Sequence, residues 1–216
     1  MKGRSAMKTI AVIGTFDTKG IEFQYIKQRI ESLGLGTFMI HTGVFDPTFP
    51  VDVNNDVIAA AAGYDINEIV AKKDRALGTK ALSEGLEKLL PKLYAEGKFD
   101  GVLSAGGSGG TSIATPAMRA LPIGVPKVMV STMASGNVAQ YVGTSDVIMI
   151  PSIVDVAGLN KISKTIFSNA VLAVAGMVGM KASLPQEAED DKPLIAATMF
   201  GVTTPCVDQA KAYLQG

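Results

Sequence analysis

The chain has one cysteine, one histidine and no tryptophan. A single cysteine excludes an intramolecular disulfide and fits a reducing compartment, so we expect a cytoplasmic protein. A single histidine excludes a multi-histidine metal cluster. Cys206 has no evident base, which argues against a Cys–His nucleophile.

Net charge is also lacking, because 20 lysines and arginines balance 20 aspartates and glutamates. We therefore expect neither a membrane surface nor nucleic acid as the main partner. The apolar segment from Ile166 to Met180 is short and interrupted by Ser168, Asn169 and two glycines, so the sequence predicts no bilayer span. The first six residues lack the apolar region of a signal peptide.

What is present is an alternation of short apolar runs with segments of helical spacing. The runs predict strands over 8–14, 36–42, 101–105, 127–132 and 147–150. The spacing predicts helices over 21–33, 55–62, 65–74, 79–96, 113–119 and 160–180, with Asn55 as the cap of the second and a kink at Pro91. We therefore predict an α/β, doubly wound (Rossmann-like) fold over residues 7–182, with a mostly parallel sheet flanked by helices.

The end of the chain has a different composition. Residues 183–192 are acidic, with prolines in and just beyond them, and are predicted to be a linker. An apolar run at 194–201 and a helix at 206–214, with Thr204 as N-cap and Pro205 at the first helical position, weakly repeat the first strand and helix of the chain. We expect residues 193–216 to be the first strand and helix of a truncated second subdomain.

A glycine-rich stretch between the third strand and its helix is the main candidate site. It contains Gly106, Gly107, Ser108, Gly109, Gly110, Thr111 and Ser112. Glycines let the backbone approach a ligand, and a helix start offers free N–H groups and a positive dipole end. The stretch matches neither a Walker A loop nor a dinucleotide fingerprint, and a tight turn without a ligand is the alternative. Four glycines in five residues exceed what a turn needs, so we interpret it as a phosphate cradle.

Three other segments follow predicted strands. After the first strand come Gly14, Thr15, Asp17, Thr18 and Lys19, after the second comes His41, and after the fourth come Ser135, Gly136 and Asn137. The threonines and Lys19 suit phosphate, whereas Asp17 suits a helix cap, a ribose hydroxyl or Mg²⁺ equally. His41 fits either adenosine contact or packing. In an open parallel sheet, loops beyond the carboxyl ends share one crevice, so we expect these segments to face the same ligand.

With these motifs laid out, the sequence resembles the tomato mosaic virus resistance protein-like ATP-binding family, an uncharacterised protein family. The resemblance rests on residues 14–19, 106–111, 130–136, 141–146 and 199–203. It implies ATP binding, two subdomains and a full-length protein about twice this length. It names a ligand better than a reaction.

We therefore expect a nucleotide-binding module that prefers ATP, with or without Mg²⁺, and whose reaction is unassigned. Two alternatives stay open. One is an ATP-gated interaction or regulatory protein without catalysis, and the other is a two-domain enzyme for a nucleotide-sugar or for ATP-dependent phosphoryl or adenylyl transfer. The apolar segment at 160–180 also suggests self-association into a homo-oligomer.

Overall fold

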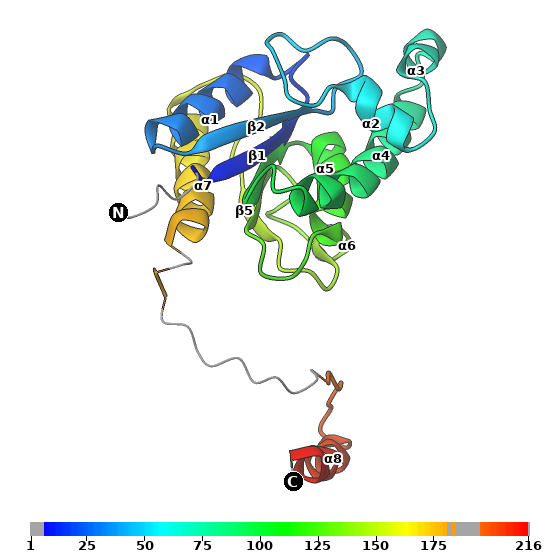
Figure 1. Ribbon diagram of the computed structural model, residues 1–216, viewed down its shortest axis with the longest axis vertical. Coiled ribbons are helices and arrows are strands. Elements are labelled where there is room, and N and C mark those ends of the chain that lie inside the picture. The colour runs from blue at the N-terminus through cyan, green and yellow to red at the C-terminus, as the bar shows by residue number, and fades with distance from the viewer. Residues whose placement is uncertain (1–6, 181–182, 185–194, 216) are drawn as a thin grey trace. The chain divides into compact units, whose positions relative to one another are not determined.

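Figure 1 shows the computed structural model, which describes residues 7–180, 183–184 and 195–215. The chain divides into two compact units, Met1–Ser183 and Leu184–Gly216. The strands of the first unit are β1 (Thr9–Gly14), β2 (Gly36–His41), β3 (Gly101–Gly106), β4 (Lys127–Ser131) and β5 (Ile148–Pro151). Its helices are α1 (Gly20–Ser32), α2 (Asn55–Ala61), α3 (Ile66–Lys72), α4 (Arg75–Ala95), α5 (Ser108–Ala120), α6 (Ala139–Val142) and α7 (Lys161–Met180).

The five strands form one parallel sheet in the order β2-β1-β3-β4-β5. β1 lies between β2 and β3, with Gly14 beside His41 of β2 and Ile13 beside Ser104 of β3. The α/β doubly wound fold predicted from the sequence is confirmed. The five strands also lie where their apolar runs predicted them, within a residue or two at each end.

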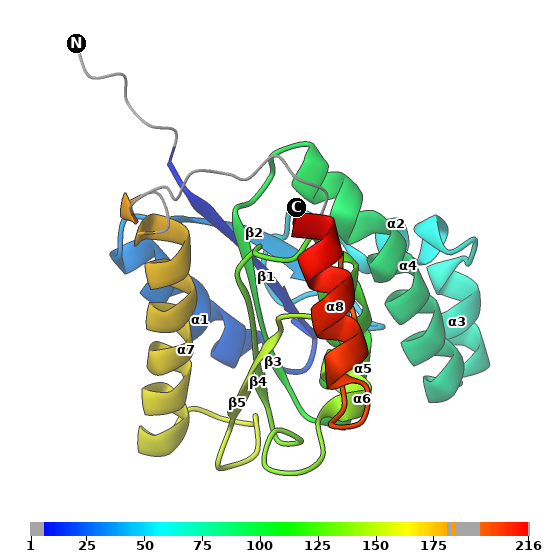
Figure 2. The ribbon, with the colours of Figure 1, turned by 90° about the horizontal axis from the view of Figure 1, so that it is seen from below.

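The helices form a layer on each face of the sheet. Figure 2 shows α1 and α7 on one side of the strands and α4 and α5 on the other. Within β1, Ala11 and Ile13 pack into the core under α2, α4 and α5, whereas Ile10 and Val12 pack into the core under α1 and α7. A strand covered on both faces needs apolar residues at successive positions, which explains the unbroken apolar run.

Aspartates set the beginnings of two helices near the edge of the sheet. Asp74 Oδ1 accepts hydrogen bonds from the amides of Ala76 and Leu77 at 2.9 and 3.1 Å, so α4 begins at Arg75 and not at the predicted residue 79. Asp65 caps α3 by accepting from the Asn67 amide.

Asn55 does not cap α2 as predicted, because the N-cap position is Asn54. Asn55 is buried, and its Nδ2 donates to the carbonyls of Gly43, Val44 and Phe45. Its amide therefore holds the irregular segment after β2 against the fold. This role depends on a loop ten or more residues earlier in the chain, so the residues next to Asn55 indicated only a helix cap.

Helix α7 meets the length and hydropathy of a membrane-spanning helix, and is the one helix of the described residues to do so. The helix as formed is longer than the apolar segment considered in the sequence, because it begins at Lys161 and has 20 residues. One stripe of it, containing Phe167, Val171, Val174 and Val178, is nonetheless buried in the core beneath the sheet. Leu172, by contrast, is 57% exposed, so part of the helix surface is uncovered. The packed stripe is that of a helix flanking a sheet.

The second unit contains α8 (Thr204–Gln215). The strand predicted over 194–201 is wrong for residues 195–201, which hold no strand; Leu194 and the predicted linker from residue 185 onward lie outside the described residues. A strand needs a neighbour to accept and donate its ladder hydrogen bonds, and no strand partner pairs with this run in the described chain. The predicted helix forms but begins at Thr204, so Pro205 occupies its second position.

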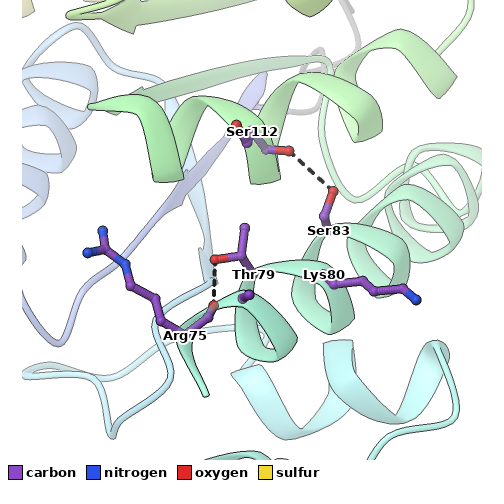
Figure 3. A pocket seen from close by; sticks show the side chains of 6 residues that line it. Arg75, Thr79, Lys80, Ser83 and Ser112 are labelled. Carbon is purple, nitrogen blue, oxygen red and sulfur yellow. Dashed lines mark hydrogen bonds between the residues drawn. The ribbon is translucent and has the colours of Figure 1, made fainter. Parts of the chain in front are cut away.

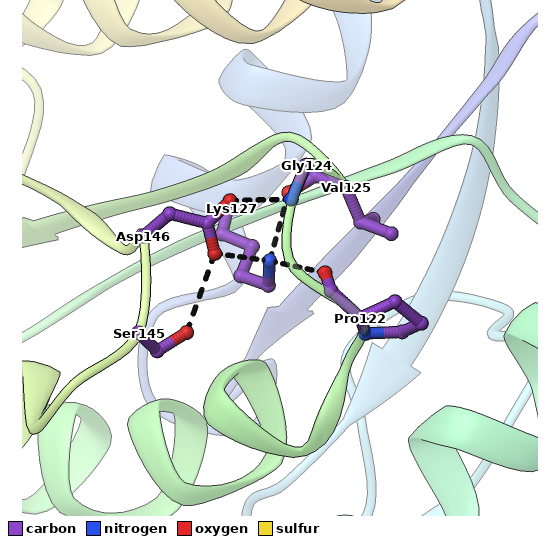
Figure 4. Close-up of polar contacts among 6 residues, drawn as sticks. All are labelled: Pro122, Gly124, Val125, Lys127, Ser145 and Asp146. Carbon is purple, nitrogen blue, oxygen red and sulfur yellow. Dashed lines mark hydrogen bonds and ion pairs between the residues drawn. The ribbon is translucent and has the colours of Figure 1, made fainter. Parts of the chain in front are cut away.

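An ion pair between the buried Lys127 and the exposed Asp146 closes the amino end of β4 (Figure 4). Lys127 is 1% exposed, and its Nζ donates to Asp146 Oδ1 at 2.6 Å and to the carbonyls of Pro122 and Val125. Burial alone raises the pKa of Asp146, but the hydrogen bonds from Lys127 and the Gly124 amide outweigh it and hold the pKa below its ordinary value. This cluster lies at the edge opposite the candidate site and ties the turn before β4 to the segment before β5.

Candidate functional site

The strand order changes direction between β1 and β3. β1 runs on to β2 on one side, and β3 runs on to β4 and β5 on the other. The turns that follow β1 and β3 leave the same carboxyl edge of the sheet (Figure 1). In open α/β sheets this reversal of strand order is where ligands bind. The predicted segments at 14–19 and 106–112 are therefore brought to one edge.

The glycine-rich stretch is mainly the beginning of a helix and not a loop. α5 begins at Ser108 with Gly107 as its N-cap, so Gly109 and Gly110 lie in its first turn. The N-cap has no side chain, and no side-chain hydrogen bond covers the turn. The amides of Ser108, Gly109 and Gly110 have no acceptor within the helix. They point out of the helix start beside the end of β3, as the phosphate hypothesis requires.

Gly106, at the end of β3, allows a close contact, whereas a Cβ on Gly107 would make only an ordinary one. A Cβ added to Gly106 would lie 3.1 Å from the Cα of Gly110, so the strand end and the first turn of α5 pack tightly. A Cβ on Gly107 would lie 3.7 Å from Thr132 Oγ1. Thr132, directly after β4, was not singled out from the sequence, although its place after a strand was a usable signal.

The hydroxyl of Thr111 is engaged in hydrogen bonds within the fold. Thr111 is fully buried, and its Oγ1 donates to the Gly107 carbonyl at 2.7 Å and lies 2.7 Å from Ser131 Oγ. Ser131 Oγ in turn accepts from the Met133 amide. The predicted ligand is thus a brace that ties the first turn of α5 to the end of β4. Ser112 is half-buried and lies one position further along α5, where its carbonyl accepts from Ser83.

The β1–α1 turn is fixed from below by aromatic packing. Phe16 is buried, with its ring centroid 4.9 Å from those of Phe23 and Phe49. Above it, Thr18 Oγ1 lies 3.2 Å from Thr15 Oγ1, and both residues are at least partly exposed. These hydroxyls lie at the shared edge, as predicted.

Asp17 bridges the turns after β1 and β2. Its Oδ1 accepts from the Thr18 amide at 2.8 Å, and its Oδ2 accepts from the Phe45 amide at 3.2 Å. A Cβ on Gly43 would lie 2.2 Å from Asp17 Oδ1, so Gly43 is what lets the carboxylate lie there. In the described part of the chain, no group of three or more His, Cys, Asp or Glu side chains could hold a metal ion.

Lys19, predicted to suit phosphate, is bound to the segment after β5. Its Nζ donates to the carbonyl of Val156, in the segment after β5, and Glu22 Oε1 accepts from the Gly158 amide of that segment. The same segment contains Ile153, which has a φ of 65°, an unusual value for a β-branched residue. Ile153 lies at the centre of a tight turn, in which the Val154 amide donates to the Ser152 carbonyl. Lys19 and Glu22 therefore clamp the β5 loop to the start of α1.

His41 is a buried structural residue here. Its Nδ1 accepts from the Phe16 amide at 3.1 Å, and its Nε2 lies 2.7 Å from the Phe45 carbonyl. Because Nδ1 accepts, the ring proton belongs on Nε2, which donates to Phe45. Burial lowers the pKa of His41 and keeps the ring neutral. Of its two predicted uses, the packing role is the one these contacts describe.

The segment after β4 is exposed at Ser135, Gly136 and Asn137. Asn137 Oδ1 accepts from the Ala139 amide at 3.0 Å, which ties this segment to the first residue of α6, whose N-cap is Val138. Ser135 and Gly136 stay open to solvent on the β4 side of the α5 start.

Arg75 is a cationic residue near the site that sequence reasoning missed. A Cβ on Gly109 would lie 3.8 Å from Arg75 Nη2, which places the guanidinium beside the first turn of α5. Figure 3 shows Arg75 at the start of α4, next to a pocket of about 580 Å³ lined by Arg75, Ala76, Thr79, Lys80, Ser83 and Ser112. Its signal was weak, because Arg75 was expected in a connection between two helices, far in sequence from the glycines.

Comparison with known proteins places this architecture in a family. Residues 8–183 match the model of the N-terminal domain of an uncharacterised protein family, UPF0261. A UPF0261 protein of Clostridium tetani is 46% identical over 209 residues, covering 96% of this chain and 51% of the relative. One of Rhizobium meliloti is 44% identical, covering 93% of this chain and 49% of the relative. The chain thus spans about half the length of these relatives.

A plant protein is also similar. The ToMV resistance protein Tm-1(GCR237) of Solanum lycopersicum is 37% identical over 221 residues, which cover 94% of this chain and 29% of the tomato protein. Because the family model spans most of the chain and includes every strand of the sheet, the chain belongs to the UPF0261 family, of which residues 8–183 form the N-terminal domain.

Proposed function

We propose that the chain binds ATP, with the phosphates at the N-terminus of α5. The observation that carries this proposal is the uncapped first turn at Ser108, Gly109 and Gly110, located where the strand order reverses between β1 and β3. Free amides and the positive end of the helix dipole favour an anion of high charge. A polyphosphate supplies several oxygens for these donors.

Backbone shape supports the same ligand. Gly107 has no side chain over the helix start, so a phosphate can approach the amides closely. The hydroxyls of Thr15 and Thr18 lie on the β1 side, and the exposed Ser135 and Gly136 lie on the β4 side. We assign these residues to the rim of the site, and Asn137, Thr111 and His41 to its support.

Neutralising the negative charge of the phosphates requires either a rearrangement of Lys19 or a metal ion. Lys19 reaches a phosphate only by releasing the Val156 carbonyl, which would also loosen the β5 loop. Asp17 is a single carboxylate, and Mg²⁺ in nucleotide sites is commonly bound by one or two carboxylates together with the phosphates. We therefore propose that Mg²⁺ enters with ATP and not ahead of it.

Calorimetric titration tests the proposal, using ATP, ADP, NAD and UDP-glucose with and without Mg²⁺. ATP should bind most tightly, and Gly109→Val should weaken it at least about tenfold by placing a branched side chain over the helix start. Gly176→Ala is the control, because a Cβ there meets nothing within 4 Å and it lies in α7. No ATP binding, or unchanged affinity in Gly109→Val, would reject the proposal. Release of phosphate or AMP during the titration would identify an enzyme and not a nucleotide-gated binding protein.

A further inference from the structure

The pocket between α4 and α5 is separate from the amides assigned to ATP. Five of its six lining residues are polar or charged: Arg75, Thr79, Lys80, Ser83 and Ser112. Its volume of about 580 Å³ is in the range of small-molecule sites. The remaining lining residue is Ala76, and most of the lining surface is apolar, so the pocket suits a ligand with a carbon skeleton that also carries polar groups.

The guanidinium of Arg75 is the charged group at the pocket's end nearest the α5 start. It has no hydrogen-bond or ion-pair partner among the described residues, and its neighbour Asp74 is committed to the amides of Ala76 and Leu77. In contrast, Lys80 Nζ lies 3.9 Å from Glu84 Oε1, so the charge of Lys80 is partly neutralised. The planar fork of arginine suits a phosphate or a carboxylate.

Two of the three hydroxyls that line the pocket, those of Thr79 and Ser83, have already donated their protons. Thr79 Oγ1 donates to the Arg75 carbonyl at 3.0 Å, and Ser83 Oγ donates to the Ser112 carbonyl at 3.2 Å. Figure 3 shows both hydroxyls on the side of α4 that faces α5. Each oxygen can still accept a hydrogen bond but has no proton left to give. A ligand that carries O–H donors as well as a negative charge therefore suits these two oxygens and Arg75.

We propose that this pocket binds a small anionic polyol, namely a sugar phosphate or a sugar acid. Its anionic group pairs with Arg75, and its hydroxyls donate to Thr79 and Ser83. The carbon stems of Arg75 and Lys80 pack on the carbon skeleton of the ligand. This pocket adjoins the proposed ATP site at Arg75, and its occupancy is measurable without a nucleotide.

Titration of the 216-residue chain with glucose 6-phosphate, gluconate and glucose tests the proposal. At least one of the two anions should bind saturably, and neutral glucose should bind at least about tenfold more weakly, the loss expected for a charge-assisted hydrogen bond. Arg75→Gln should weaken the anion about tenfold or more, and Thr79→Val about fivefold. Lys88→Gln is the matched control, since it removes one positive charge from an exposed position of the same helix outside the pocket.

The two anions separate the sources of the charge: preference for glucose 6-phosphate identifies a sugar phosphate, and preference for gluconate a sugar acid. Binding of neither anion, equal binding of glucose, or equal losses in Lys88→Gln and Arg75→Gln would overturn the proposal. Thermal unfolding of each variant shows whether it is folded, and Ser83→Ala repeats the hydroxyl test if Thr79→Val is not. ATP titration of Thr79→Val distinguishes the two sites, because that variant should lose the polyol and retain ATP.

Discussion

His41 shows at the residue scale how burial decides the role of a titratable group. Both ring nitrogens are used, and Nδ1 faces the Phe16 amide, so a proton added there would oppose an N–H donor. The folded state therefore binds this proton less readily than the unfolded chain, as the lowered pKa indicates. Stability is full above the unfolded pKa of about 6.5 and falls as the pH drops from there toward the lower folded pKa.

We predict that His41→Gln flattens this dependence. The variant should be less stable at neutral pH but should lose less on acidification, measured by urea unfolding at pH values of about 7.5 and 5.5. The chain has no second histidine to supply the same slope. An unchanged difference between the two pH values would show that His41 is not the group that titrates.

Lys127 is a second polar residue whose role depends on its burial, through its ion pair with Asp146. Removing Asp146 leaves the Lys127 charge buried with only carbonyls as partners. We predict that Asp146→Ala lowers the free energy of unfolding by about 3 kcal/mol. Adding Lys127→Met should restore part of that loss, because no unpaired charge then stays inside.

Urea unfolding measures both variants, with Glu87→Ala on the exposed face of α4 as the control. The wild-type contribution of Asp146 is present above its unfolded pKa of about 3.9 and is lost as the pH falls through its lower folded pKa. A double variant less stable than Asp146→Ala alone would contradict the account of an uncompensated buried lysine.

At the scale of elements, some helical glycines are required by a close contact with another helix, and others are not. A Cβ on Gly85 of α4 would lie 1.9 Å from the backbone carbonyl of Ile58 in α2, so the two helices touch through this glycine. A Cβ on Gly176 of α7 would meet nothing within 4 Å. The sequence places both glycines inside helices and gives no means of telling them apart.

We predict opposite effects of the same substitution at these positions. Gly85→Ala should destabilise by about 2 kcal/mol or more, because the α2 backbone must move. Gly176→Ala should stabilise by about 0.5–1 kcal/mol, the gain in helix propensity. Thermal and urea unfolding measure both. A stabilised Gly85→Ala would mean that α2 and α4 are not in contact as described.

Helix α5 illustrates an element whose type was predicted but whose beginning was not. The glycines suggested a loop through residue 112, whereas the helix starts at Ser108. Glycine disfavours a helix interior by about 1 kcal/mol relative to alanine, but it is tolerated in a first turn where backbone amides are still free. The ligand-binding hypothesis moves accordingly from a flexible loop to a rigid helix start.

At the scale of the whole molecule, α7 is assigned by what it packs against. By length and hydropathy it qualifies as a membrane span, yet Val174 is fully buried beneath the sheet. We predict that Val174→Asp strongly destabilises the domain in urea unfolding, whereas Leu172→Asp, at a position 57% exposed, has little effect. The wild-type chain should stay in the supernatant when phosphatidylcholine vesicles are sedimented. Equal sensitivity of the two positions, with vesicle binding, would place α7 in the bilayer.

The sequence alone determined the strands and the fold class. Buried parallel strands need apolar residues at consecutive positions, and helices between them need the 3.6-residue period; both signals are local. These local signals also identified the turns after β1 and β3 as candidates for one site. They also produced the wrong strand at residues 195–201, because local pattern does not show whether a partner strand is present.

Tertiary structure alone decided what each candidate side chain does. Thr111 became a brace, Lys19 a clamp on the β5 loop and His41 a neutral support, because their partners come from segments far away in sequence. Arg75 lies beside the first turn of α5 for the same reason, because α4 packs on α5. Backbone geometry follows from nearby residues, whereas hydrogen-bond partners and burial follow from the assembled fold.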